Sequence, residues 1–117
     1  MEKELYVSFY DEEKERVNLK LVGEIDHHSA VALRHEVDEM LMKLRPETLY
    51  IDLSAVEFMD SSGLGFIMGR FTLMKNLGGE TVVINPSPGA KRILTLAGME
   101  KLIRIEKREV KTNDGKK

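Results

Sequence analysis

Alternating apolar and polar residues at the start of the chain predict two β-strands. Apolar side chains occur at every second position through residues 5–10 and again through residues 17–21. An acidic turn at residues 11–14 separates these two runs. Because a period of two places alternate side chains on one face of a strand, we expect an antiparallel strand pair whose second strand ends at Gly23.

A helical period replaces this alternation after Asp26. Apolar residues then recur at spacings of three and four up to Leu44, and Arg45 and Pro46 close the run. An aspartate directly before such a pattern is a favoured N-cap, because its carboxylate accepts free backbone N–H groups. We therefore predict a helix that begins after Asp26 and ends before Pro46.

The second half of the chain alternates short apolar runs with helical patterns. The predicted strands are residues 49–53, 81–84 and 102–105. The predicted helices are residues 61–76 and a later helix that opens on Ser87 and Pro88 and ends at Gly98. Serine as N-cap, proline in the first turn and glycine after the last turn are typical helix boundaries.

This order of elements predicts an α/β fold, with a mixed β-sheet of about five strands and crossover helices. Consecutive strands separated by helices run parallel through right-handed crossovers. The carboxyl ends of parallel strands share one edge of the sheet. We therefore expect three loops to meet at that edge, namely residues 24–28, 60–62 and 85–87.

Length and charge narrow the class of protein. The 117 residues match one domain, which we assign to residues 1–106, and the charged residues 107–117 are expected to form a disordered tail. The net charge is −2 with acids and bases interspersed, which argues against nucleic acid or a membrane surface as partner.

No apolar run predicts a membrane span or a signal peptide, so a cytoplasmic protein is expected. The absence of cysteine excludes disulfides and thiolate chemistry.

Residues 58–65 (FMDSSGLG) carry the strongest indication of function, because an apolar strand ends there and a helix begins with two hydroxyl groups. Ser61 and Ser62 directly follow Asp60. Free backbone N–H groups and the positive end of the helix dipole favour a phosphate group at such a position. The two serines are therefore the first candidates for a functional site.

A hydrolase is the alternative from another class. One of these serines could combine with His27 or His28 and an aspartate in a catalytic triad. However, Met59 and Asp60 stand where the G-x-S-x-G turn of many hydrolases needs its first glycine. The hydrolase interpretation is therefore the less favoured one.

No cofactor or metal is predicted. The glycines after Ser62 match neither the dinucleotide fingerprint nor a phosphate-binding loop that ends in lysine. His28 and His35 are spaced to share a helix face, but no further soft ligands accompany them. Asp26 is better explained as a helix cap, with the histidines at the entrance of the helix.

The predicted helix over residues 61–76 is apolar on two sides when its residues are projected at about 100° each. One side suits packing on the sheet and comprises Leu64, Ile67, Met68, Phe71 and Met74. The other side carries Phe66, Leu73 and Leu77, next to Ser62, Gly69 and Arg70. These three residues either form an apolar patch for a protein partner or are covered by neighbouring helices, and the pattern leaves both possibilities open.

Two motifs resemble those of the STAS family, and within it those of the anti-anti-sigma factors of sporulation. They are residues 21–28 (LVGEIDHH) and residues 58–65, the latter together with Gly69 and Arg70. The order of elements agrees with that family from about Leu5 to Ile105.

The resemblance implies a regulatory binding protein and not an enzyme. Proteins of this family bind an anti-sigma factor that is also a serine kinase, and so displace its sigma factor. The kinase phosphorylates the serine after the motif aspartate, here Ser61, and a serine phosphatase reverses the modification, while ATP or ADP belongs to the kinase. A stress-response factor of the same family is the alternative, and a small hydrolase using Ser61 with Asp26 and His27 is less favoured.

Carried over to this chain, the partner surface comprises the first loop and the start of the second helix: Asp26, His27, His28, Asp60, Ser61, Ser62, Gly63, Leu64, Gly65, Phe66 and Arg70. Gly63 and Gly65 either let the kinase approach the backbone closely or serve packing. A phosphate on Ser61 is locally favoured at a helix N-terminus, so we expect it to leave the fold intact and to repel the partner.

Overall fold

A five-stranded sheet with strands in sequence order forms the centre of the computed structural model, which describes residues 5–109. The strands are β1 (Tyr6–Asp11), β2 (Arg16–Ile25), β3 (Thr48–Met59), β4 (Glu80–Ile84) and β5 (Arg104–Glu106). The helices are α1 (His27–Leu44), α2 (Ser61–Asn76) and α3 (Pro88–Leu96), followed by the short 3-10 helix η1 (Met99–Lys101). Because β1 runs antiparallel to β2 and the other pairs are parallel, the predicted α/β fold with a mixed sheet is confirmed.

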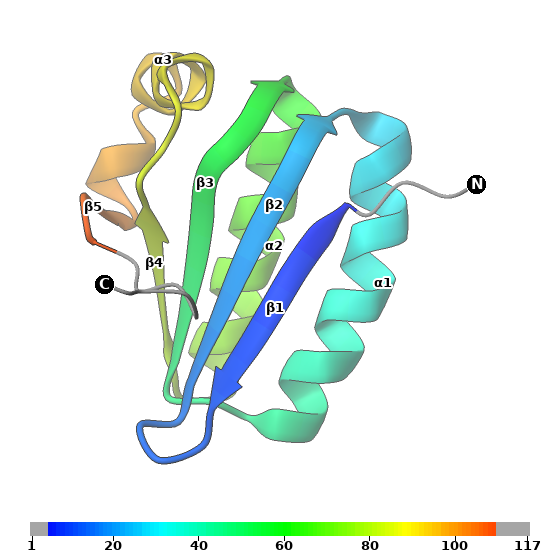
Figure 1. Ribbon diagram of the computed structural model, residues 1–117, viewed down its shortest axis with the longest axis vertical. Coiled ribbons are helices and arrows are strands. Elements are labelled where there is room, and N and C mark those ends of the chain that lie inside the picture. The colour runs from blue at the N-terminus through cyan, green and yellow to red at the C-terminus, as the bar shows by residue number, and fades with distance from the viewer. Residues whose placement is uncertain (1–4, 110–117) are drawn as a thin grey trace, which may run out of the picture.

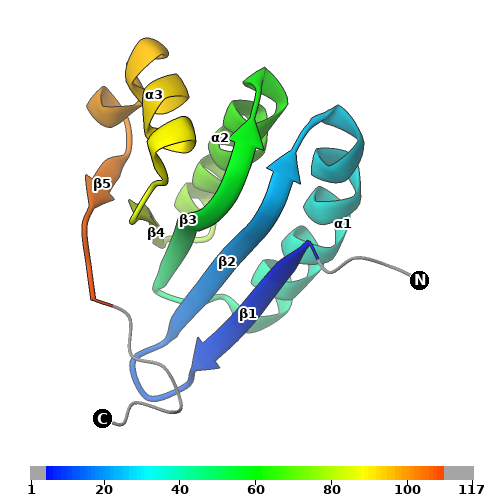
Figure 2. The same cartoon turned by 45° about the horizontal axis from the view of Figure 1, so that its top comes forward.

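Helices α1 and α2 cover one face of the sheet, and α3 lies beside the end of β3, beyond the end of β4 (Figures 1 and 2). The side chains of β2 and β3 that point toward α1 and α2 are fully buried, including Val17, Leu19, Leu49 and Ile51. Burying a side chain of this size stabilises a fold by about 1.5–3 kcal/mol. The main core therefore lies between the sheet and these two helices, and Ala90 and Leu94 of α3 extend it.

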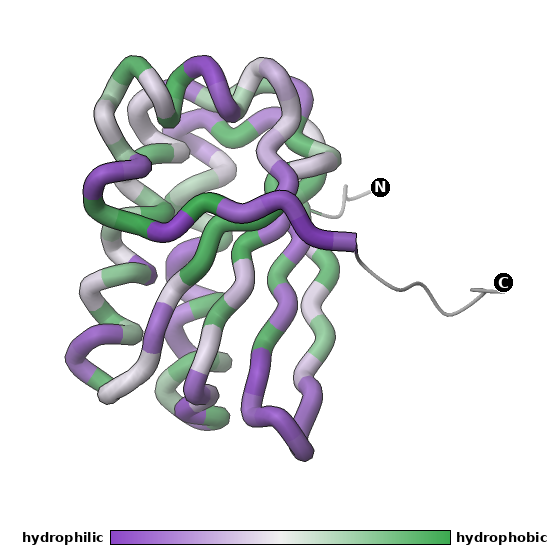
Figure 3. Tube along the Cα trace, turned by 90° about the vertical axis from the view of Figure 1, so that its left-hand side faces the viewer, coloured by the Kyte–Doolittle hydropathy of each residue, from purple (hydrophilic) through white to green (hydrophobic). Residues whose placement is uncertain are grey.

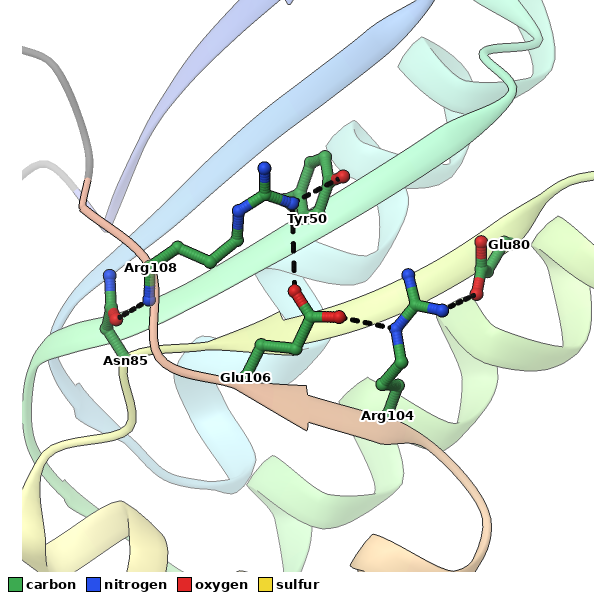
Figure 4. A network of polar contacts seen from close by, with 6 residues as sticks. All are labelled: Tyr50, Glu80, Asn85, Arg104, Glu106 and Arg108. Atoms are coloured by element: carbon green, nitrogen blue, oxygen red, sulfur yellow. Dashed lines mark hydrogen bonds and ion pairs between the residues drawn. The ribbon is translucent and has the colours of Figure 1, made fainter.

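A smaller apolar cluster on the opposite face of the sheet consists of Tyr50, Val82 and Ile84. The last described residues cross this face as a hydrophilic segment, which is purple in Figure 3. The Arg108 guanidinium lies 4.7 Å from the centre of the Tyr50 ring and donates a hydrogen bond to the Tyr50 hydroxyl at 2.7 Å (Figure 4). The C-terminal segment thus shields the second cluster.

Polar contacts fix this segment to the neighbouring strands. The backbone N–H of Arg108 donates to Asn85 Oδ1 at 2.7 Å, and Glu106 joins Arg108 to Arg104, which in turn reaches Glu80 (Figure 4). Arg108 falls inside the stretch 107–117 that the sequence assigns to a disordered tail. Residues 110–117 lie outside the described part, so the boundary of the tail stays a prediction.

Three predicted strands have wrong limits, and the last of them is predicted over residues 102–105 but is found at Arg104–Glu106. Gly23 does not end β2, which continues through an irregular register to Ile25. Gly23 adopts a φ of 88°, a left-handed conformation that glycine takes without strain, and so the strand passes through this position. β3 does not stop at Leu53 but continues to Met59, and the polar residues Ser54 and Glu57 conceal this extension in the sequence. Among the described helices, none has both the length and the apolarity needed to cross a membrane.

Candidate functional site

Strands β2 and β3 end side by side, and each leads directly into a helix. Ile25 at the end of β2 is paired with Met59 at the end of β3. The backbone N–H of Asp60 donates to the Ile25 carbonyl at 3.3 Å, which joins the two turns. The starts of α1 and α2 therefore form one rim of the molecule, at the top of Figure 1.

Asp26 is the N-cap of α1, as predicted. Its carboxylate accepts the Ser29 backbone N–H at 3.0 Å, and Ser29 Oγ accepts the Asp26 backbone N–H at 3.0 Å. These reciprocal bonds form a capping box. The Ser29 backbone hydrogen bond is the main cause that lowers the pKa of Asp26, so the carboxylate is held ionised. Its first role is to fix the turn that carries His27 and His28, both of which are exposed.

Asp60 caps α2 in a similar way and leaves Ser61 exposed. The Asp60 carboxylate accepts the Ser62 backbone N–H at 2.8 Å. Ser61 is the first residue of α2 and is exposed, while Ser62 is half-buried. The first turn of α2 contains no acidic residue. Ser61 is therefore open to a modifying enzyme at a helix N-terminus whose dipole favours a negative charge.

The same geometry argues against the hydrolase interpretation. Both carboxylates accept backbone N–H groups of their own helices. Within residues 5–109, no hydrogen bond joins Ser61 to His27 or His28. A catalytic triad needs its base hydrogen-bonded to the nucleophile and oriented by a carboxylate, and these residues are not arranged so.

The two glycines of the rim have different roles. A Cβ at Gly63 would lie 3.0 Å from Met59 Cβ and 3.1 Å from Met59 Sδ. A Cβ at Gly65 would meet nothing within 4 Å, and this residue is exposed. Gly63 is therefore a packing glycine, whereas Gly65 leaves the backbone open to a close approach.

Phe66 and Arg70 do not offer surface to a partner, contrary to the expected partner surface. They are only 3% and 4% exposed. Arg70 Nε lies 2.7 Å from Asp38 Oδ1 of α1, and Arg70 Nη1 donates to the Phe66 carbonyl at 3.1 Å. Burial lowers the pKa of Arg70, and the charge of Asp38 acts against this shift. Arg70 therefore joins α2 to α1, and Phe66 belongs to the main core.

Phe66, Leu73 and Leu77, for which the sequence left a partner-binding patch and a covered arrangement both open, do not form an exposed apolar patch. Phe66 belongs to the main core, and Leu73 and Leu77 are half-buried. Of the two possibilities left open by the sequence, the covered arrangement is found for Phe66 and in part for Leu73, which packs against the main core.

Only two of the three predicted loops meet at the rim. β4 ends at Ile84, which pairs with Asp52, while β3 continues from there to Met59. Residues 85–87 therefore lie short of the rim, where the Ser87 N–H donates to the Leu53 carbonyl and Ser87 Oγ donates to the Val56 carbonyl at 2.7 Å. The prediction fails for this loop because it assumes parallel strands of equal length.

Phe58 is a rim residue that the predicted site lacks. Its side chain is 54% exposed although it is apolar, and it lies beyond Leu53, where the predicted buried strand ends. Local periodicity gives no signal for its exposure, which depends on how β3 pairs with β2.

The fold and the rim define an α/β binding domain that presents a serine at a helix N-terminus. The sequence model of the STAS domain matches residues 10–112. The anti-sigma F factor antagonist of Paenibacillus polymyxa is 38% identical over 92 residues, or 79% of each chain. The anti-sigma-B factor antagonist of Bacillus subtilis (strain 168) is 35% identical over 91 residues, which cover 76% of this chain and 80% of that protein.

Solved structures agree with these relatives. The anti-sigma factor antagonist SpoIIAA in its unphosphorylated form has a TM-score of 0.74 and 26% identity over 86% of both chains. The Bacillus cell fate determinant SpoIIAA in the phosphorylated form has a TM-score of 0.67 and 26% identity, covering 86% of this chain and 89% of that chain. The chain therefore belongs to the STAS domain family, among the anti-sigma factor antagonists, which are regulatory binding proteins and not enzymes.

Proposed function

We propose that the unphosphorylated chain binds an anti-sigma factor that is also a serine kinase and thereby releases a sporulation sigma factor. Phosphorylation of Ser61 by that kinase weakens the complex, and a serine phosphatase restores binding. The observation that carries this proposal is the exposure of Ser61 as the first residue of α2, directly after the capping Asp60. The protein needs no cofactor of its own, because the nucleotide belongs to the kinase, and it acts in the cytoplasm.

Because of the position of Ser61, its phosphorylation has different effects on the fold and on partner binding. A phosphate there interacts favourably with the N-terminal end of the α2 dipole. Further along α2, Ile67 and Met74 are fully buried, so core packing holds the helix in place. The modification therefore leaves the domain folded.

The cost of the phosphate falls on the complex. It adds about two negative charges beside Asp60, at a contact where the kinase also holds its nucleotide phosphates. Like charges brought together in an interface cost several kcal/mol, and each ~1.4 kcal/mol weakens binding tenfold. One phosphate is therefore enough to release the partner.

The relatives support this proposal and bear on the choice of sigma factor. One similar protein has been solved in phosphorylated and unphosphorylated forms. The relative from Paenibacillus polymyxa is an anti-sigma F factor antagonist, which favours sporulation, as does the segment of Asp26, His27 and His28. A stress-response role is the alternative, favoured by the 35% identity to the anti-sigma-B factor antagonist.

Intact mass tests the proposal. The protein is incubated with ATP alone, with ATP and the anti-sigma F factor of its own cell, and with ATP and the anti-sigma B factor if that cell has one. We expect one added phosphate with the sporulation kinase only, none on Ser61→Ala, and its removal by the serine phosphatase. Phosphate on the protein alone would indicate an enzyme, modification by the anti-sigma B factor would indicate the stress-response role, and no phosphate in any mixture would refute both family roles.

A further inference from the structure

The side chains of β3 change face close to the rim. Gly23 of β2 is paired with Val56, but the next residue, Glu24, is paired with Phe58. Glu57 is therefore an extra residue in β3, as in a β-bulge. In a regular strand, Phe58 would share the buried face of Val56, because side chains repeat every second residue.

The bulge turns Phe58 outward and Met59 inward. Val56 and Met59 are buried at 1% and 3% exposure, whereas Phe58 is 54% exposed. Met59 then fills the space beneath Gly63, where a Cβ would lie 3.0 Å from Met59 Cβ. Core packing alone gives no reason to expose the ring of Phe58 while the smaller Met59 is buried. Bulges often occur beside functional sites, where they redirect a side chain.

Phe58 lies within the area that a partner on Ser61 would cover. They are three positions apart in the chain, so their Cα atoms are at most about 11 Å apart. A protein interface of ordinary size covers about 800 Å² on each partner, which corresponds to a disc with a radius of about 16 Å. Aromatic residues are enriched in such interfaces and often provide much of their affinity.

We propose that Phe58 is an apolar anchor for the kinase that modifies Ser61, with its ring held in an apolar pocket of that partner. This inference rests on the proposed function and adds a contact that the sequence motifs do not assign. The anchor is uncharged, so it contributes to the affinity of the partner independently of the charge on Ser61. Phosphorylation therefore has to overcome an apolar contact that it does not itself remove.

The test compares Phe58→Ala with Phe9→Ala, a matched control. Phe9 is 64% exposed, and it pairs with Asn18 of β2, about 20 Å along the strand from the Glu24 that pairs with Phe58. The dissociation constant for the anti-sigma factor kinase with ADP and the KM for phosphorylation are measured for each variant. We expect Phe58→Ala to raise both at least tenfold, Phe58→Leu to restore part of the loss, and Phe9→Ala to change either by less than about twofold.

The outcomes distinguish this inference from the proposed function. If the wild-type protein is bound and phosphorylated but Phe58→Ala behaves like it, the anchor is refuted and the proposed function stands. If the kinase neither binds nor phosphorylates the wild-type protein, the proposed function itself fails. Thermal unfolding is the second measurement, because a loss of binding that is matched by a large loss of stability would assign Phe58 to packing and overturn the anchor.

Discussion

Met59 and Gly63 fit together only because Gly63 has no side chain: a Cβ there would stand 3.0 Å from Met59 Cβ and 3.1 Å from Met59 Sδ. Met59 is the last residue of β3 and Gly63 lies in the first turn of α2. Their contact sets how closely the helix start approaches the end of the strand. The position of Ser61, between these two residues, therefore depends on a packing glycine.

Gly63→Ala is expected to destabilise the domain by about 1 kcal/mol. Alanine favours a helix over glycine by roughly 0.8–1 kcal/mol, but overpacking a core usually costs about 1–3 kcal/mol. Gly69→Ala is the control, since a Cβ there meets nothing within 4 Å, and it is expected to stabilise by about 0.5–1 kcal/mol. Urea unfolding measures both variants, and equal stabilisation by the two alanines would contradict the packing role of Gly63.

The ion pair between Arg70 and Asp38 predicts unequal effects of its two truncations. The Arg70 side chain is 5% exposed and that of Asp38 is 27% exposed. Asp38→Ala leaves a buried, unpaired guanidinium, whereas Arg70→Met leaves a carboxylate that water can reach. We expect Asp38→Ala to lower the free energy of unfolding by about 2–3 kcal/mol and Arg70→Met by about 1 kcal/mol or less. The double variant should regain part of the Asp38→Ala loss, and strictly additive losses would contradict a direct coupling.

Helix limits can be predicted from this sequence because the signals that set them are local. Asp26 and Ser87 cap α1 and α3 as expected, and the predicted limits of α2 are those found. Each cap needs only a side-chain oxygen and an N–H group two or three residues away. The serine at the start of α2 could therefore be placed correctly before any tertiary contact was known.

Features that depend on distant segments could not be predicted in this way. The outward turn of Phe58 arises from the pairing of β3 with β2, in which Glu57 has no partner of its own. The burial of Arg70 requires Asp38 on another helix. The position of residues 85–87 depends on how far β3 extends beyond β4. None of these features produces a recognisable residue period or spacing within a single segment of the sequence.

The pH dependence of stability tests the cap at Asp26. Hydrogen bonds from Ser29 lower the pKa of Asp26, so the ionised carboxylate stabilises the folded state. This contribution is present above the unfolded pKa of about 3.9 and is lost as the pH falls through the lower folded value. Asp26→Asn keeps a cap acceptor that does not titrate. The stability advantage of the wild-type protein over Asp26→Asn should be constant near neutral pH and shrink below about pH 4, and an advantage that persists in acid would contradict the prediction.

Arg108→Ala tests whether the C-terminal segment holds the second apolar cluster. The variant loses a guanidinium 4.7 Å from the Tyr50 ring centre and a hydrogen bond of 2.7 Å to the hydroxyl. We expect a loss of about 1 kcal/mol in the free energy of unfolding. Arg16→Ala is the control, since its guanidinium lies 5.6 Å from the same ring, and it should cost about 0.5 kcal/mol or less. An unchanged stability of Arg108→Ala would place the start of the disordered tail at Lys107, as the sequence suggests.

Three variants of Ser61 separate charge from size in the proposed switch. Ser61→Ala and Ser61→Asn should bind the kinase as the wild-type protein does, whereas Ser61→Asp should bind at least tenfold more weakly. All three should stay folded, with Ser61→Asp stabilised by about 0.3–1 kcal/mol because a carboxylate at a helix N-terminus is favoured. Raising the ionic strength from 0.1 to 1 M shortens the screening length from about 10 to 3 Å, so the binding defect of Ser61→Asp should shrink. If Ser61→Asn, which has nearly the size of aspartate but no charge, binds as weakly as Ser61→Asp, the switch is steric and the electrostatic mechanism is wrong.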